Sequence, residues 1–524
     1  MLDLLLYNAR VITMDPARPT ASAIGVWRDR IVGLDDDVNG MPARRQVDLG
    51  GAVVLPAFLD AHVHQVWAGM AATGATVAPC TDVHDVLAAV RVAAAARPVG
   101  EWVDLAGYDQ RPLGRHLTAA ELDTVSAGRK VFLVHDSGHA CVVNTAVLEL
   151  LPPDVPHDDG FLAESGMAAV RALRQPYSQT EMIDAIEHAG NVCLAQGITA
   201  VAEAGIGGGL ISYSPAELAA YQRASDDGRL PVRTQLMVAG VATHPLGAHP
   251  ADDIPAGLDL GLRTGFGGDR LNIGAMKIFT DGGMMARTAA LSEPYTGLDH
   301  SGQLFDSVAA MEELVLAGHR AGWQLAVHAI GDRAVDVALD AIDRAQREKP
   351  RPEARHRIEH AGLVRPDQLS RFAELGVTAV VQPNFLYYLG DDYAVIMGER
   401  RAPWLYRGQG FLDAGVRLVA SSDRPVTEGA PLRNIQFMVN RQTRHGHSLG
   451  PAEAMFVYDA LRAYTVDAAW ACHWEHDLGS VTAGKLADLV VLAEDPLAVP
   501  VDRIAGIPIL ATVLGGTEAH GSLD

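Results

Sequence analysis

The sequence predicts an α/β protein: a (β/α)8 barrel of the TIM type, a small β-sandwich built from both chain termini, and a subdomain inserted after the first barrel strand. Three observations support this prediction. Apolar strand-like runs alternate with helical segments through the middle of the chain, which indicates βα units and a parallel sheet. Short strand-like runs occur at both ends. One gap between the barrel strands is far too long for a single loop.

The first fifty residues contain short strand candidates broken by turn residues at Asp15-Pro16 and Arg28-Asp29, a spacing that suits an antiparallel sheet. Apolar, β-rich runs return near the other end. Because neither end holds enough strands for a stable sheet, residues 1–54 and 476–524 are expected to form one composite β-sandwich. The expected strands are Leu4–Asn8, Arg10–Met14, Ala23–Trp27, Arg30–Leu34, Asp488–Leu492 and Ile509–Leu514.

Residues 55–475 supply eight strand candidates with helices between them, which is enough to close a barrel. The first gap, about 66–190, contains further strand-like segments, so an inserted subdomain is expected to cover the barrel mouth. The barrel strands expected are Val53–Leu59, Ile198–Glu203, Arg233–Val238, Ile273–Phe279, Gln324–His328, His356–Glu359, Thr378–Gln382 and Arg417–Ser421. The helices include Val308–Ala321 and Arg333–Gln346, and the inserted strands include Trp102–Ala106 and Val131–Val134.

The composition, 48% hydrophobic and 20% charged residues, is that of an ordinary globular protein. A net charge of −22 argues against partners such as nucleic acid or an anionic membrane. The four cysteines form no CxxC pair, so neither a disulfide framework nor a zinc knuckle is indicated. Since we find no signal-peptide pattern and no apolar run of the ~18 residues that span a bilayer, we expect a cytoplasmic enzyme with a small-molecule substrate. A homodimer stays an open option.

The sharpest local signal is the segment 55–64, Leu-Pro-Ala-Phe-Leu-Asp-Ala-His-Val-His. Because residues two apart on a strand point to the same side, His62 and His64 can present two imidazoles to one point. Imidazole is a common neutral metal ligand that suits zinc, iron and nickel. The pair closes a strand, and active sites of barrels lie at the C-terminal ends of their strands. The alternative is an accidental pair on a surface strand.

Other strand ends carry side chains that could act in the same way. His328, His360 and Asp423 each end an apolar run. Taken singly, each could be a capping residue or a satisfied core histidine, but their place at successive strand ends predicts a shared site. Glu203 ends another strand, and it is either a bridging carboxylate or a polar cap.

Lys277 lies in the apolar run Ile273–Phe279, in a chain that strongly prefers arginine to lysine. A buried charged amine is costly, so its pKa falls. A neutral amine can react with carbon dioxide to give a carbamate, a carboxylysine able to bridge two cations. The alternative is a salt bridge to Asp281.

Together these motifs resemble the amidohydrolase superfamily, and within it the amidohydrolase-3 group of YtcJ-like and N-substituted formamide deformylase-like proteins. The resemblance covers nearly the whole chain. The segments that match, in order, are 31–34, 58–64, 100–103, 107–110, 138–144, 277–282, 328–332, 357–360, 422–426 and 484–492.

The resemblance implies a metal centre of one or two divalent ions, expected to be Zn2+. Asp423 would serve as ligand and as catalytic base, and Glu203 could replace the lysine as the bridging group. The implied metal ligands are His62 and His64 on the more buried ion, His328 and His360 on the second, Lys277 as a carboxylated bridge, and Asp423.

The reaction implied is metal-dependent hydrolysis of a C–N bond in an amide, such as an N-substituted formamide or a cyclic amide. Asp423 would take a proton from the attacking water and give it to the leaving amine. The residues alone would equally permit ester or phosphoester hydrolysis. Hydrolysis of a lactone or carbamate and a non-catalytic scaffold are further alternatives. A deaminase is disfavoured because Gly331 stands where such enzymes usually carry Glu, and Asp332 is expected to cap the next helix.

Substrate specificity is expected to come from aromatic, Met and polar residues in or just beyond the strand-end motifs, although each could instead be ordinary packing. Two departures from the resemblance are expected near the pocket. Relatives commonly read Asp-Gly-Ser where this chain has Asp-Gly-Gly at 281–283, and they often have a small residue where it has Arg424. The candidate substrate contacts are His139, Trp67, Tyr108, Met284, Arg287 and Phe385, followed by Met285, Tyr387 and Tyr388.

Overall fold

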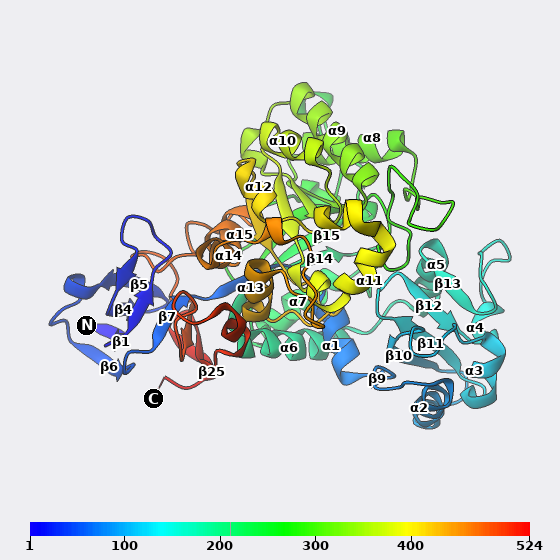
Figure 1. Cartoon of the computed structure of the whole chain (residues 1–524), viewed down its shortest axis with the longest axis horizontal. Coiled ribbons are helices and arrows are strands. Elements are labelled where there is room, and N and C mark those ends of the chain that lie inside the picture. Colours follow the sequence, from blue (N-terminus) through cyan, green and yellow to red (C-terminus); the bar gives the residue numbers. More distant parts are fainter. Residues whose placement is uncertain (210, 524) are drawn as a thin grey trace.

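In the computed structural model, which describes residues 1–209 and 211–523, eight parallel strands curve into a barrel at the centre of the molecule (Figure 1). The predicted mixed α/β barrel is therefore confirmed. The barrel strands, in the order in which they neighbour one another, are β8 (Phe58–Val63), β14 (Ile198–Ile206), β15 (Arg233–Ala239), β18 (Leu271–Phe279), β19 (Leu325–Ala329), β20 (Arg357–His360), β21 (Thr378–Val381) and β22 (Leu418–Ala420).

Backbone hydrogen bonds at the rim bring the last strand back to the first. The Asp423 N–H donates to the His62 carbonyl oxygen at 2.8 Å, and the His64 N–H donates to the Arg424 carbonyl oxygen at 3.0 Å. The barrel is therefore nearly closed, and the segments that follow β8 and β22 lie side by side at its C-terminal rim.

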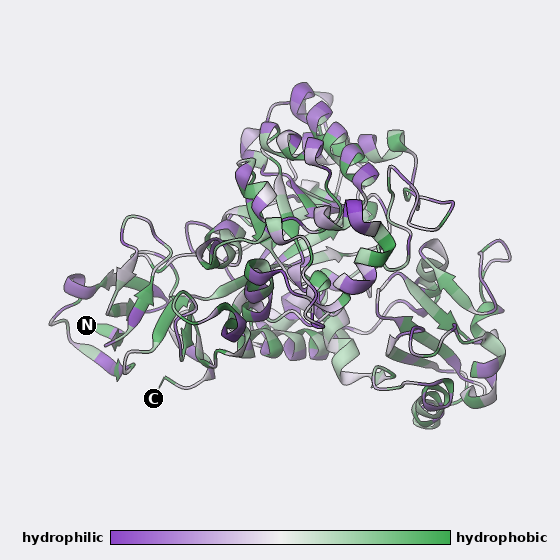
Figure 2. Ribbon diagram, viewed as in Figure 1, coloured by the Kyte–Doolittle hydropathy of each residue, from purple (hydrophilic) through white to green (hydrophobic). Residues whose placement is uncertain are grey.

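Helices cover the outer face of the barrel, so strands such as β14 and β15 are buried along their whole length. In α9 (Asp332–Glu348), Val335, Leu339 and Ile342 face the core at helical spacing. Figure 2 shows both hydrophobic and hydrophilic residues on the helices that surround the barrel. The other longer helices are α1 (Gln65–Thr73), α6 (Gln179–Ala195), α7 (Glu217–Asp226), α8 (Val308–Arg320), α10 (Pro366–Glu374), α11 (Pro383–Arg401), α13 (Pro431–Asn440), α14 (Val457–Ala463) and α15 (Val466–Ala471).

Strands from both ends of the chain share one six-stranded sheet, and a four-stranded sheet from the N-terminal segment lies against it. The two sheets enclose a core that includes Leu6, Val26, Val491 and Val513. Both termini lie in this part of the molecule, at the left of Figure 1. Its strands are β1 (Leu2–Tyr7), β2 (Arg10–Ile12), β3 (Thr20–Ala21), β4 (Ile24–Trp27), β5 (Arg30–Leu34), β6 (Ala43–Asp48), β7 (Val53–Pro56), β23 (Leu489–Leu492), β24 (Ile509–Leu514) and β25 (Thr517–Gly521).

The single strand predicted over Val53–Leu59 is wrong, because the chain forms two strands there. β7 belongs to the six-stranded sheet and β8 to the barrel. The Ala57 N–H donates to Asp488 at 3.0 Å, whereas the next N–H, of Phe58, donates to Gly197 at 2.9 Å. The backbone thus changes its partner within one residue, and a continuous apolar run gives no sign of such a change.

Between β8 and β14 the chain builds a separate five-stranded sheet, at the right of Figure 1. Its core includes Val90, Leu105, Leu122 and Val131. The elements here are β9 (Ala75–Thr76), α2 (Val83–Ala95), β10 (Trp102–Tyr108), α3 (Ala119–Ser126), β11 (Lys130–His135), β12 (Ala140–Val143), α4 (Thr145–Leu148), β13 (Phe161–Ala163) and α5 (Ser165–Arg174).

Across residues 1–209 and 211–523, no helix is both long and apolar enough to cross a membrane.

Candidate metal centre and active-site cavity

His62 and His64 lie at the C-terminal end of β8, and both side chains are buried. His62 belongs to the strand, and His64 directly precedes α1 as its N-cap residue. Burial lowers the pKa of His62 to about 4 and also lowers the pKa of His64. Both imidazoles are therefore neutral near pH 7, which is the form that binds metal ions.

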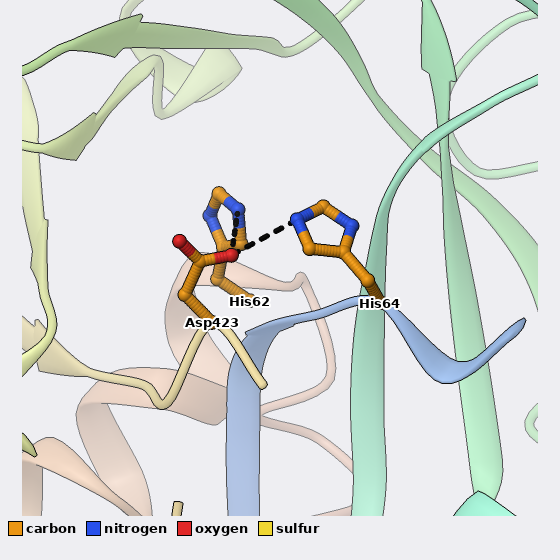
Figure 3. Close-up of side chains that lie close together, drawn as sticks. All are labelled: His62, His64 and Asp423. Atoms are coloured by element: carbon orange, nitrogen blue, oxygen red, sulfur yellow. Dashed lines mark ion pairs between the residues drawn. The ribbon is translucent and has the colours of Figure 1, made fainter. Parts of the chain in front are cut away.

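Asp423 follows β22 with a left-handed backbone (φ of 54°) and brings its carboxylate to the two imidazoles. Its Oδ1 atom lies 2.9 Å from His64 Nε2 and 3.5 Å from His62 Nε2. Figure 3 shows both interactions ending on the same carboxylate oxygen. One ligand atom from each of the three residues lies within 4.8 Å of the others.

These three groups fit a divalent metal ion. The Oδ1 atom of Asp423 is buried yet makes no hydrogen bond of ordinary geometry. The two neutral imidazoles beside it each offer a nitrogen lone pair. Two nitrogens and one carboxylate oxygen form a donor set that Zn2+ binds at about 2.0–2.2 Å.

Lys277, on β18, extends this group. Its Nζ atom lies 3.2 Å from His62 Nε2, and the residue is only 1% exposed. Burial lowers the pKa of its amine to about 8. The alternative salt bridge to Asp281 is wrong, because the Asp281 carboxylate instead accepts the backbone N–H groups of residues 290, 330 and 331.

His328 and His360 end the neighbouring strands β19 and β20, with ring centroids 4.4 Å apart. The Nε2 atom of His328 lies 3.3 Å from Asp281 Oδ1, and the Nδ1 atom of His360 lies 2.8 Å from Gln382 Oε1. These contacts leave Nδ1 of His328 and Nε2 of His360 for a ligand. All six metal ligands expected from the sequence therefore line one cavity.

The residues behind the site were missed by the sequence analysis. The Oε2 atom of Glu359 lies 2.5 Å from His62 Nδ1, and Glu359 is itself paired with the buried guanidinium of Arg357. Gln382 holds His360 in a similar way. The spacing of Arg357 and Glu359, two apart on a strand, was a usable signal for an ion pair on one side of β20.

Glu203, the alternative bridging residue, does not join the six. One carboxylate oxygen lies 4.0 Å from His64 Nδ1, and the other accepts the Gln65 N–H at 2.5 Å. Burial raises the pKa of this carboxyl to about 8. Glu203 thus supports the start of α1, and it does not cap its own strand, because β14 continues to Ile206.

The cavity has an empty volume of about 920 Å3, its open mouth included. Of the expected substrate contacts, Trp67, His139, Met284, Met285 and Phe385 line it. Much of the remaining wall is apolar, and the inserted segment adds a polar side. Further lining residues are Ile211, Phe279, Ile330, Leu389, Tyr393 and Val426 on the apolar side, and Gln110, Arg111, His135, Asp136 and Ser137 on the polar side.

Tyr108 and Arg287, also expected as substrate contacts, lie outside this lining. Tyr108 is fully buried in the inserted sheet, where its hydroxyl accepts the Leu117 N–H at 3.0 Å. Arg287 is exposed. Tyr387 and Tyr388 are also outside the lining. A position in a motif or just beyond one therefore did not suffice to bring these side chains to the cavity.

Two neighbouring charged residues do not act on the cavity directly. Arg424 follows Asp423 at the rim, but its side chain does not line the cavity, because its guanidinium donates to Gln196 at 2.6 Å and to the Gly429 carbonyl at 3.0 Å. Asp332 does not cap α9 but is its first residue. Its carboxylate accepts the Ser292 N–H at 2.9 Å.

Comparison with known proteins places this site in a family. Residues 45–520 match the model of the amidohydrolase family. The chain is 30% identical to an N-substituted formamide deformylase from Arthrobacter pascens, over 98% of each protein, and 28% identical to the protein LONG AFTER FAR-RED 3 from Arabidopsis thaliana, over 99% of this chain and 91% of the relative. The crystal structure of an uncharacterised metal-dependent hydrolase from Pyrococcus horikoshii matches with a TM-score of 0.77 and 27% identity, covering 96% of this chain and 99% of the other.

Proposed function

We propose that this protein cleaves the C–N bond of an amide. The premise is that the chain belongs to the amidohydrolase family and is a hydrolase. The observation that carries this proposal is the convergence of His62, His64 and Asp423 at the floor of a mostly apolar cavity. A substrate carbonyl bound there would meet buried polar groups on one side and apolar walls on the others.

We propose a divalent metal ion, Zn2+ by the donor set, held by His62, His64 and Asp423, with Lys277, His328 and His360 completing a second position. When bound, such an ion activates water and polarises a carbonyl group. Neutral imidazoles and a neutral lysine amine are the forms that these roles require. Burial lowers the pKa of His62 to about 4, which makes its imidazole neutral near pH 7. It lowers the pKa of Lys277 to about 8, so the amine loses its proton more readily than an exposed lysine but is still mostly charged near pH 7.

Asp423 is the proposed catalytic base. Its Oδ1 atom faces His62 and His64 and would hold the metal ion, so the other carboxylate oxygen, Oδ2, would accept a proton from the attacking water. The same oxygen would then give that proton to the leaving nitrogen as the C–N bond breaks. Burial raises the pKa of Asp423, but His62 and His64 outweigh this effect and lower it below its ordinary value, which keeps the carboxylate ready to accept a proton.

The substrate class we favour is an N-substituted formamide or a cyclic amide with an apolar substituent. The similarity to a formamide deformylase supports the bond, and the apolar lining supports the substituent. In this proposal Trp67, Met284 and Phe385 contact that substituent, and His139 supplies a polar contact. Tyr108 and Arg287 are left out because they lie outside the cavity.

Metal content per chain tests the centre. The protein is expressed with zinc and bicarbonate, freed of loosely bound metal and measured by elemental analysis. About two ions per chain support the bridged centre with Lys277 as a carbamate, and about one ion reduces Lys277 to a role as a buried charge. A chain without tightly bound metal contradicts the metal centre and favours a non-catalytic scaffold.

A substrate panel then tests the bond. Matched amides, formamides, esters, lactones and carbamates with the same apolar substituent are compared by kcat/KM in the metal-loaded enzyme. We expect the highest values for the C–N substrates. Faster turnover of the lactone or ester would keep a hydrolase but reject the amide assignment.

A further inference from the structure

Glu164 lies where the inserted sheet meets the barrel mouth. One carboxylate oxygen is 3.1 Å from Nδ1 of His139, and the other accepts a hydrogen bond from the hydroxyl of Thr288 at 2.5 Å. The residue is buried and has a φ of 49° and a ψ of −113°, a conformation that residues other than glycine rarely adopt. Such strain persists only where the surrounding structure imposes it, and it is concentrated at functional sites.

The contact with Glu164 fixes the ring of His139. Because an ionised carboxylate only accepts hydrogen bonds, Nδ1 carries the hydrogen and Nε2 is the nitrogen left for a molecule in the cavity. The backbone is fixed as well, since the Glu164 N–H donates to the His139 carbonyl oxygen at 2.8 Å. Burial acts to lower the pKa of His139, but Glu164 outweighs it and raises that pKa above its ordinary value. The ring centroid lies 6.1 Å from that of His328, so His139 stands beside the histidines at the strand ends.

Gly283 has no side chain, and this leaves space for the ring of His139. A Cβ atom at position 283 would lie 3.2 Å from Cδ2 and 3.5 Å from Nε2 of His139. At the adjacent Gly282, a Cβ atom would lie 2.5 Å from Glu164 Oε1. The Gly283 N–H also donates to the Thr288 hydroxyl at 3.0 Å, so this loop and the Glu164–His139 pair are packed as one unit.

We propose that Nε2 of His139 contacts the scissile amide group, that Glu164 is the positioning residue for this ring, and that Gly283 is a specificity-determining position. The inference rests on the proposed function, and it specifies which atom of His139 makes the polar contact and which part of the substrate that atom meets. In this proposal a short amide head group binds in the cavity that His139 and the candidate metal ligands line together. Any side chain at position 283 moves the ring by a few tenths of an ångström and reduces that fit.

The test uses full-length, metal-loaded protein with formanilide as the probe. The variants are His139→Ala, Glu164→Gln, Gly283→Ala and the double variant Gly283→Ala with His139→Ala. Both kcat/KM and the Kd for formanilide, by calorimetry under conditions of slow turnover, are measured. Gly506→Ala is the matched control, because a Cβ atom there meets nothing within 4 Å.

We expect His139→Ala to lower kcat/KM about tenfold to a hundredfold, because the substrate loses a contact that positions its reacting group. Gly283→Ala and Glu164→Gln should each lower it about tenfold, because small misplacements at a reacting centre are costly. Metal content should stay at the wild-type value in all of them, and Gly506→Ala should behave as wild type. In the double variant, Gly283→Ala should cost nothing further, since the ring that it displaces is gone.

The proposal is overturned if Gly283→Ala lowers kcat/KM by the same factor in the wild type and in the His139→Ala variant. The loop would then act independently of the ring. Wild-type kcat/KM in Glu164→Gln overturns the positioning role. If the wild type binds metal but turns over no amide, the proposed function fails instead. Formanilide binding then decides the contact: a weaker Kd in His139→Ala supports it, and an equal Kd or no binding to the wild type rejects it.

Discussion

The Nδ1 atom of His62 lies 2.5 Å from the Oε2 atom of Glu359, and both side chains are fully buried. Glu359 pairs in turn with Arg357, whose guanidinium also donates to the Ala61 carbonyl at 2.7 Å. Because the carboxylate only accepts, the hydrogen of His62 is fixed on Nδ1 and the lone pair of Nε2 is left for a metal ion. The candidate metal centre is therefore supported from inside the barrel.

Glu359→Gln should weaken metal binding about 10- to 100-fold, because supporting partners of metal-bound histidines have effects of this size. The measurement is the zinc Kd by competition with a chelator. The surface variant Glu348→Gln, whose carboxylate pairs with Arg320 and Arg344, is the control and should keep the wild-type Kd.

Glu359→Gln also leaves the Arg357 guanidinium without its carboxylate in the barrel interior. This loss should lower the free energy of unfolding by about 3–5 kcal/mol. Combining Glu359→Gln with Arg357→Met should recover much of the free energy of unfolding while zinc binding stays weak. Recovery of zinc binding together with stability would show that Glu359 acts on the fold and not on His62.

His62→Ala should lose metal and hydrolytic activity together while the barrel stays folded. The reason is that His62 supplies one of three ligand atoms within 4.8 Å of one another, whereas the barrel core is apolar. Elemental analysis, kcat/KM and the far-UV circular dichroism spectrum are compared with those of the wild type. Retained metal and turnover in this variant would reject the site.

Glu217→Gln should make the protein more stable at alkaline pH. Burial raises the pKa of Glu217 from 4.5 to about 7, so between these values the unfolded chain releases a proton that the folded chain retains. The free energy of unfolding therefore falls as pH rises through this window, by roughly 3 kcal/mol in total. The neutral amide avoids that loss, so the variant should match the wild type below pH 4.5 and exceed it above pH 7.

Urea unfolding at pH 4.5 and pH 8 checks this prediction, with the exposed Glu353→Gln as the control. A Glu217→Gln variant that is less stable than the wild type at pH 8 would mean that the carboxylate is charged and paired in the folded chain.

Gly69→Ala should destabilise the protein by about 1–3 kcal/mol, the usual cost of overpacking a core. A Cβ atom at this position of α1 would lie 2.0 Å from the Ala185 carbonyl oxygen in α6, so the two helices must separate. The thermal midpoint is measured beside that of Gly247→Ala, where a Cβ atom meets nothing within 4 Å. Equal midpoints would contradict the close approach of the two helices.

The sequence by itself determined the barrel and the set of residues at its rim. Apolar runs are buried on both faces in a parallel sheet, so their positions could be read directly, as for β14 and β18. The C-terminal ends of parallel strands meet at one rim, and the side chains of His62, His328, His360 and Asp423 were therefore expected together. That expectation followed from the strand ends alone and did not require the distances between these side chains.

Only the tertiary structure decided which other side chains support or reach the site. Glu359 meets His62 and Glu164 meets Thr288 across long stretches of sequence, because barrel closure and the packing of the inserted sheet bring them together. Tyr108 lies in a motif that suggested a substrate contact, yet its hydroxyl accepts the Leu117 N–H inside the inserted sheet. A local pattern fixes which face of a strand a residue occupies, whereas the partner on that face depends on how distant segments pack.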